Sequence, residues 1–93
     1  MSGGGSSSVV YNATALASGW SNSAPYTQTI TVNGLTSTMN PVIDVVLSDT
    51  TSTAIDEGTA WSYVGKATTG TNSITLKCYE NKPTVDLDFI IKT

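Results

Sequence analysis

Two alternating segments near the C-terminus decide the fold: SITLKCY at residues 73–79 and TVDLDFII at residues 84–91. In each of them every second side chain is apolar, which is the pattern of a β-strand with one buried face. The four residues that separate them, 80–83, have the length and the polar composition of a hairpin loop. The sequence therefore predicts an antiparallel hairpin near the end of the chain.

One pairing register of this hairpin suits both of its faces. It places Cys78 opposite Val85 on the apolar face and Lys77 opposite Asp86 on the polar face. Facing apolar pairs and facing opposite charges both stabilise an antiparallel ladder, and a shift by one residue would lose both. We therefore expect Cys78 inside the protein and Lys77 near Asp86.

Further strands are expected upstream of the hairpin. Residues 9–16 predict a weak first strand, and residues 26–32 alternate cleanly between two faces. Asn33-Gly34 follows the second of these segments as a turn signal. Residues 42–47 are almost continuously apolar, which is typical of a central strand buried on both faces.

A helix is expected over residues 51–64, because the apolar spacing changes there from two residues to three or four. The residues that set this spacing are Ala54, Ile55, Gly58, Trp61, Val64 and Gly65. On a helix they share one stripe, which predicts that Ile55 and Trp61 are buried. Gly58 would let the helix approach the sheet closely.

These elements predict a mainly β, α+β fold, either a small antiparallel sheet or an open sandwich. It would have about five strands, with one short helix packed on it. A chain of 93 residues suits a single domain, which we place at residues 9–93. Residues 1–8, MSGGGSSS, contain little that can be buried. They predict a flexible Gly/Ser arm, which is either a native arm that orders against a partner or a cloning linker.

The composition excludes several classes of function. Charged residues make up 12% of the chain, Lys and Arg together number four, and the formal net charge is −3. Nucleic-acid binding needs clustered basic side chains, so no nucleic-acid partner is expected. With no His and one Cys, neither a Ser–His–Asp triad nor a Cys-based zinc site can form. We predict no enzymatic activity, no catalytic residue, no cofactor, no metal site and no membrane span.

The side chains that can carry chemistry are better explained by structure. Asp86 and Asp88 share a strand face, and Asp56 adjoins Glu57. Paired carboxylates serve glycoside hydrolysis or calcium binding in other proteins, but a solvated face is favoured here. Cys78 sits at an inward position and is expected to be a small core hydrophobe rather than a nucleophile.

The remaining candidates are aromatic and apolar residues that predict contacts with partners. The residues expected at a partner or oligomer interface are Val9, Val10, Tyr11, Trp20 and Tyr26. Tyr79 follows on the polar face of its strand, so its ring is the best placed to stack on a sugar.

Three stretches carry a family resemblance: GWS at residues 19–21, APYTQ at residues 24–28 and KPTVDL at residues 82–87. With Trp61 in the expected helix, they resemble a small domain that is common in phages and prophages of Firmicutes. In that family the domain often sits at the C-terminus of longer tail, baseplate or other virion-associated proteins. The resemblance covers about residues 15–93, and it implies a virion setting and no chemistry.

The function expected from these observations is that of a non-enzymatic virion protein. It would be a head-decoration, head-fibre or tail/baseplate component that assembles on a major capsid or tail/baseplate protein. A homo-oligomer is expected, and a trimer by analogy with other virion accessory proteins. The alternative is a glycan-binding or receptor-binding module that is displayed on the particle and takes a host-surface glycan.

Overall fold

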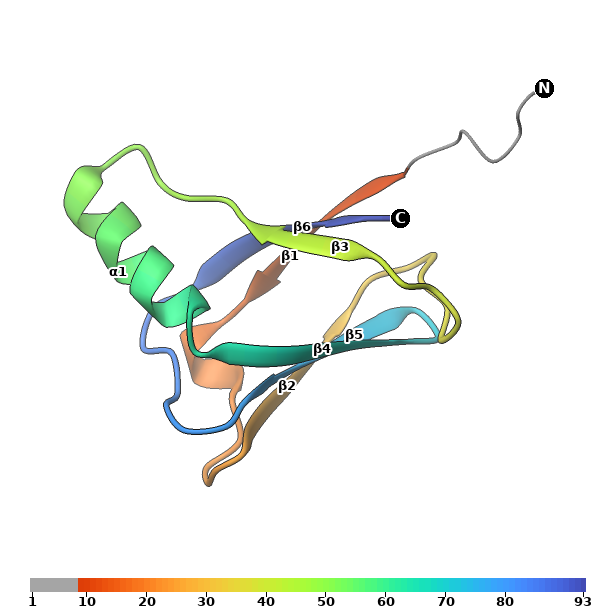
Figure 1. Ribbon diagram of the computed structural model, residues 1–93, viewed down its shortest axis with the longest axis horizontal. Coiled ribbons are helices and arrows are strands. Elements are labelled where there is room, and N and C mark those ends of the chain that lie inside the picture. Colours follow the sequence, from red (N-terminus) through yellow and green to blue (C-terminus); the bar gives the residue numbers. More distant parts are fainter. Residues whose placement is uncertain (1–8) are drawn as a thin grey trace.

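The computed structural model describes residues 9–93, so the arm expected at residues 1–8 lies outside the described part of the chain. Within that part the protein has six strands and one α-helix, joined in the order that Figure 1 shows. The strands are β1 (Val10–Ala15), β2 (Tyr26–Thr31), β3 (Val42–Val45), β4 (Val64–Gly70), β5 (Ser73–Cys78) and β6 (Leu87–Lys92). The helix α1 is Thr51–Trp61, and a single 3-10 turn covers Ala17–Gly19.

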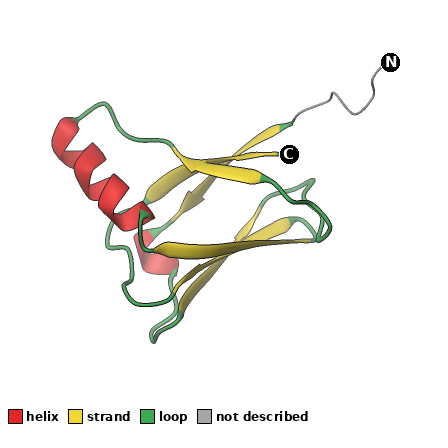
Figure 2. Ribbon diagram, viewed as in Figure 1, coloured by secondary structure: helices red, strands yellow, loops and turns green. Residues whose placement is uncertain are grey.

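The strands form two antiparallel sheets of three strands each. Sheet A has the order β1-β6-β3 and sheet B has the order β2-β5-β4. The two sheets lie face to face, and α1 connects β3 of sheet A to β4 of sheet B at one end of the molecule (Figures 1 and 2). The fold is therefore a small, mainly β sandwich with one helix, which confirms the expected fold class.

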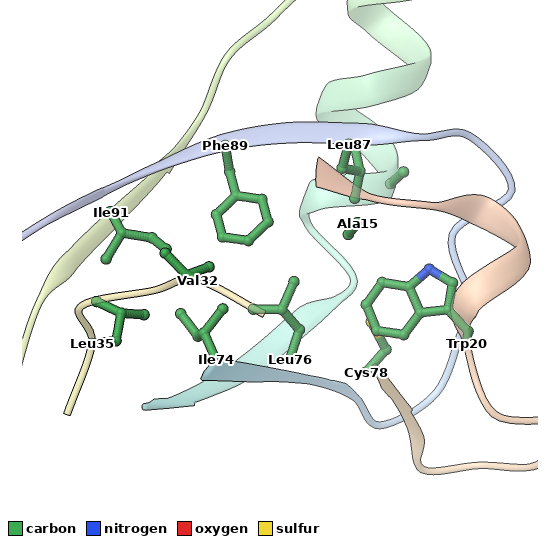
Figure 3. Close-up of a cluster of buried hydrophobic side chains, with 11 residues drawn as sticks. Ala15, Trp20, Val32, Leu35, Ile74, Leu76, Cys78, Leu87, Phe89 and Ile91 are labelled. Carbon is green, nitrogen blue, oxygen red and sulfur yellow. The ribbon is translucent and has the colours of Figure 1, made fainter. Parts of the chain in front are cut away.

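The core lies between the two sheets and is built by the two central strands. Figure 3 shows Leu87 and Phe89 of β6 on one side and Leu76 of β5 on the other, with their side chains meeting in the interior. Strict alternation produces this arrangement, because every second side chain of a strand points to the same face. The buried apolar residues are Ala15, Trp20, Val32, Leu35, Ala60, Ile74, Leu76, Cys78, Leu87, Phe89 and Ile91.

The predicted C-terminal hairpin is wrong. Strand β5 pairs with β2 and β4, and β6 pairs with β1 and β3, so the two segments belong to different sheets. Cys78 is completely buried as expected, but Asp86 does not pair with Lys77, and its Oδ1 accepts a hydrogen bond from the Ala17 amide at 2.8 Å. The reason is that two strands with matching apolar faces can be neighbours in one hairpin or can face each other across the interior of a sandwich, and the apolar pattern is the same in both cases.

Strand β3 also differs from its prediction. The apolar run was expected to form a central strand buried on both faces, but β3 is an edge strand of sheet A. Its first residue, Val42, is 65% exposed, and Asp44 is exposed as well. An apolar, β-branched run favours a strand, but it does not determine that strand's place within a sheet. The strands expected at residues 9–16 and 26–32 and the turn at Asn33-Gly34 are confirmed.

The helix is shorter than predicted and presents a different face to the core. It ends at Trp61, and Val64 already begins strand β4. Ile55 is 62% exposed, and a Cβ added at Gly58 would meet no atom within 4 Å, so neither residue lies against a sheet. Trp61 is only partly buried, and its ring packs against Phe89 with centroids 5.5 Å apart.

Glu57 explains why the buried face of the helix was misplaced. This carboxylate is 7% exposed, and it accepts hydrogen bonds from the backbone amide of Ser48 at 2.7 Å and from the Ser48 hydroxyl at 2.8 Å. An apolar pattern counts Glu57 as a surface residue, whereas the two hydrogen bonds offset the cost of burying it. The inner face of α1 is consequently centred on Glu57 and Ala60.

Candidate functional site

The outer face of sheet B is polar throughout. Its side chains alternate with the inward-facing ones of the same strands, and we call it the hydroxyl face. It consists of Thr27, Thr29 and Thr31 of β2, Ser73, Thr75 and Lys77 of β5, and Lys66, Thr68 and Gly70 of β4. Thr29 and Thr75 are direct neighbours in the ladder, and their hydroxyl oxygens are hydrogen-bonded at 2.8 Å.

Two lysines face each other on this surface. Lys66 and Lys77 are register partners of the β4–β5 ladder. Direct cross-strand neighbours have Cβ atoms about 5 Å apart, so the two lysine side chains leave the sheet side by side. No strand of sheet B contains an acidic residue, and these two lysines are its only charged side chains. The hydroxyl face therefore has a local positive charge in a chain whose net charge is −3.

Tyr79 borders the hydroxyl face beside the lysine pair. Its ring is 52% exposed, and the Nζ of Lys77 lies 5.7 Å from the ring centroid. The ring lies against Gly65, where the β4–β5 register shifts between Val64 and Lys66. A Cβ built at Gly65 would come within 2.7 Å of Cδ2 of Tyr79, so a side chain at residue 65 would displace the ring. The irregularity in β4 thus positions the aromatic ring that was predicted to contact a glycan.

A small hollow opens beside Tyr79. Its volume is about 300 Å³, and it is lined by Ser62, Tyr63, Tyr79, Glu80 and Asn81. This lining combines two aromatic rings with hydroxyl, amide and carboxylate groups. Such a combination suits a ligand with both apolar faces and hydroxyl groups, which is the chemistry of a sugar.

The outer face of sheet A has a different composition. It contains four aliphatic side chains on its three strands and their extension: Val10 of β1, Ile90 of β6, Val42 of β3 and Val46. Val10 and Val42 flank Lys92 in one row, and both of them are more than half exposed. The same face also carries polar residues, namely Asn12, Thr14, Asp44, Asp88 and Lys92. Solvent-facing positions of an antiparallel sheet are usually polar, so the exposed valines among them indicate a contact surface.

Further exposed aliphatic side chains follow β3 along the chain, in the connection to α1 and on the helix itself. We call Val42, Val46, Leu47 and Ile55 the aliphatic band, and all of them are exposed, by 46–65%. Leu47 and Ile55 border an open groove of about 790 Å³ along α1. The other residues that line it are Ser48, Asp49, Thr51, Ala54, Gly58, Thr59 and Ser62. The sequence prediction missed this groove because it assigned Leu47 and Ile55 to the interior.

The interface residues predicted from the sequence are dispersed. Val9 and Val10 are exposed at the start of β1, where the Val9 carbonyl accepts a hydrogen bond from the Thr93 amide at 3.0 Å. Tyr11 points inward and is partly buried, packed against the core. Val10 alone of these lies on the outer face of sheet A beside Val42, through their shared neighbour in β6.

Trp20 and Tyr26 belong to the interior more than to the surface. Trp20 is 5% exposed and part of the core, so it offers a partner almost no area (Figure 3). Its indole Nε1 is buried with no hydrogen-bond partner among the described residues. Tyr26 is partly buried against the core, and the Nζ of Lys82 lies 5.7 Å from its ring centroid.

The stretches that carry the family resemblance build the fold at one end of the sandwich. The Gln28 side chain accepts a hydrogen bond from the Leu16 amide at 3.1 Å and donates one to the Leu16 carbonyl at 3.0 Å. A Cβ at Gly19 would come within 2.5 Å of the Gln28 amide oxygen, so only glycine leaves room for this bridge. Pro83 is fully buried, and Asp86 binds the Ala17 amide. The side chains of Gly19, Gln28, Pro83 and Asp86 thus have structural roles, whereas Thr27 of the APYTQ stretch belongs to the hydroxyl face.

Two further candidates from the sequence, Cys78 and Asp88, are buried and hydrogen-bonded respectively. Cys78 is completely buried, which confirms its expected inward position, and this burial raises the pKa of its thiol. Asp88 accepts a hydrogen bond from the Thr14 hydroxyl at 2.7 Å on the outer face of sheet A. Within residues 9–93 no group of acidic or Cys side chains could hold a metal ion. No helix in the same range is long and apolar enough to cross a membrane.

Comparisons with family models, with curated proteins and with solved structures find no match for this chain. The two outer faces of the sandwich are therefore the features on which a functional proposal rests.

Proposed function

We propose that this chain is a structural or accessory component of a bacteriophage virion. It works by assembling as a homo-oligomer on a larger capsid, tail or baseplate protein. The observation that carries the proposal is the aliphatic band, Val42, Val46, Leu47 and Ile55, which leaves four large apolar side chains in water. Association removes such side chains from water, at about 25 cal/mol for each Å² of apolar surface buried.

Two further observations support assembly. With charged residues at 12% of the chain, electrostatic repulsion between copies is small. Among residues 9–93, the two outer strands of sheet A, β1 and β3, pair with a strand of their sheet on one side only. Each can therefore add a strand from a partner. The virion setting itself rests on the resemblance of GWS, APYTQ and KPTVDL to the phage domain.

Sedimentation of the purified protein tests the assembly. We expect the wild-type protein to sediment as a homo-oligomer, a trimer. The double variant Val42→Glu with Ile55→Glu should raise its dissociation constant at least about tenfold, because two charges per chain would be buried in the contact. The matched control is Thr31→Glu with Thr68→Glu, which adds the same charge to exposed positions of the hydroxyl face. A monomeric wild-type protein, or equal effects of the two double variants, would contradict the proposal.

A pull-down with purified capsid protein and, separately, with purified tail or baseplate protein tests the particle partner. The variant that removes residues 1–8 tests the arm, and we expect it to bind more weakly while the domain stays folded. The cut falls after residue 8 because the Val9 carbonyl binds Thr93 and Val10 pairs with Lys92. Binding to neither particle protein would contradict a virion role.

A second candidate function, a glycan-binding module, is favoured by Tyr79 and its hollow. The exposed ring, held against Gly65, borders a site of about 300 Å³ with hydroxyl, amide and carboxylate groups. A glycan array tests it: we expect Tyr79→Ala to abolish binding and Tyr79→Phe to preserve it, because the ring stacks on the sugar. No glycan bound, or equal binding by Tyr79→Ala, would exclude this candidate.

A further inference from the structure

Within the strands, acidic side chains occur only in sheet A, and the acidic residue nearest to β5 in the sequence is Glu80, beside Tyr79. The chain has seven acidic residues, and none of them lies on the three strands of sheet B. The charged side chains of those strands are Lys66 and Lys77, which are register partners on the hydroxyl face. A chain with a net charge of −3 thus concentrates two of its four basic residues at one point.

This lysine pair costs stability in the isolated domain. Like charges that face each other directly across an antiparallel ladder repel, and an acidic neighbour would relieve the repulsion. The neighbours on sheet B are instead hydroxyl groups of Thr27, Thr75 and Thr68, which carry no charge. An anionic group bound between the two lysines would supply the missing negative charge.

We propose that the hydroxyl face binds an anionic glycan, a polysaccharide whose sugar rings carry carboxylate, sulfate or phosphate groups. Lys66 and Lys77 hold the acidic groups, and the exposed ring of Tyr79 stacks on a neighbouring sugar. The site rests on the second candidate function above and specifies its ligand class. It lies on the opposite side of the sandwich from the aliphatic face of sheet A, so assembly and glycan binding use separate surfaces.

The threonine rows of this face complete the recognition of a sugar. Thr29, Thr75 and Thr68 lie side by side on β2, β5 and β4. Strands in a sheet are about 4.8 Å apart, so the row offers hydroxyl groups at intervals close to the length of a sugar ring. Each hydroxyl both donates and accepts a hydrogen bond, as the sugar hydroxyls do. Thr29 and Thr75 already bond each other, which holds both side chains in place.

The same observations distinguish a glycan from other polyanions. A nucleic acid is held through many phosphate contacts, whereas the hydroxyl face has two lysines in a protein with no net positive charge. A membrane surface requires apolar side chains next to the basic ones, and this face has none in its three strands. The hydroxyl face instead fits a polymer of sugar rings with widely spaced acidic groups, because it offers two positive charges, one aromatic ring at its border and several hydroxyl groups.

Fluorescence anisotropy with labelled polygalacturonate and labelled dextran sulfate tests the site, with neutral dextran and a single-stranded oligonucleotide as comparisons. We expect the acidic polysaccharides to bind, and binding to weaken between 0.05 and about 0.5 M salt because screening increases. Lys66→Gln and Lys77→Gln should each weaken it about two- to fivefold, and together about tenfold. Lys66→Arg with Lys77→Arg should retain binding, and Tyr79→Ala should lose more than Tyr79→Phe.

Lys92→Gln is the matched control, because it removes the same charge from an exposed position of sheet A. Equal losses for Lys92→Gln and Lys66→Gln would overturn the lysine site. Equal binding of dextran would overturn the anionic ligand while leaving a glycan-binding function, and equal binding of the oligonucleotide would overturn the glycan. Absence of binding to all four polymers overturns the inference, whereas the assembly proposal is tested independently by sedimentation.

Discussion

The two sheets of this sandwich are alike on the inside and different on the outside. Each has three antiparallel strands, and each central strand turns three fully buried apolar side chains to the shared core. Outside, sheet A exposes Val10, Val42 and Val46 among polar side chains, whereas the outer face of sheet B carries hydroxyl groups, a glycine and two lysines but no large apolar side chain. Packing constrains the inner faces equally, while the outer faces are free to differ.

This difference teaches how to locate function in a domain without a catalytic motif. Folding requires only that the outer face of each sheet be hydrophilic, so either hydroxyl groups or charged side chains would meet this requirement on both sheets. The exposed aliphatic residues of sheet A and the facing lysines of sheet B are both unfavourable in the isolated domain. For this reason our proposals place assembly on the outer face of sheet A and the anionic ligand on the hydroxyl face of sheet B.

The largest effect is expected from a substitution in the core that the two sheets share, because it destabilises both sheets together. Phe89→Ala should lower the free energy of unfolding by about 3–5 kcal/mol, since the ring is 1% exposed and lies between the two sheets. Trp61→Ala should cost less, about 2 kcal/mol, because Trp61 is only partly buried. Urea unfolding of both variants measures this. An equal or larger loss for Trp61→Ala would mean that the helix side of the core dominates stability.

A smaller effect is expected where the chain crosses from sheet A to sheet B. Glu57→Gln should lower the free energy of unfolding by about 1–2 kcal/mol, because the Ser48 amide and hydroxyl then lose one charged acceptor. Asp56→Asn is the control, because the Asp56 carboxyl is exposed and its loss should change the free energy of unfolding by less than about 0.5 kcal/mol. Thermal unfolding in the same buffer compares them. Equal shifts would show that the buried carboxylate does not hold the connection.

The smallest effect is expected on the hydroxyl face and sharpens the contrast between the two outer surfaces. Thr29→Val replaces an exposed hydroxyl by a methyl group and removes the bond to Thr75. The free energy of unfolding should change by less than about 0.5 kcal/mol, because an exposed hydrogen bond is exchanged for one with water. Binding of polygalacturonate should weaken. A loss of stability above 1 kcal/mol would mean that the threonine row is there for folding rather than recognition.

Much of the local structure could be predicted from the sequence. The inward faces of residues 73–78 and 87–92, the strand at residues 26–31 and the turn at Asn33-Gly34 were all evident from alternation and turn chemistry. The pattern also predicted an exposed Tyr79. Such features depend on which residues are apolar and on local backbone preference, and both are properties of short segments.

The tertiary structure alone decided which segments pair and which surfaces remain free. Periodicity reports that a side chain is buried, but not whether the neighbour that buries it lies beside the strand or across the sandwich. For that reason β5 and β6 were predicted as partners, although they are the centres of opposite sheets. Likewise, burial of Glu57 depends on Ser48, a residue outside the helix, and its burial turned Ile55 outward. The lysine pair exists because residues 64–70 form a strand that pairs with β5, and the aliphatic band is exposed because β3 is an edge strand and α1 turns Glu57 and Ala60 inward. Neither result followed from the apolar pattern of these segments.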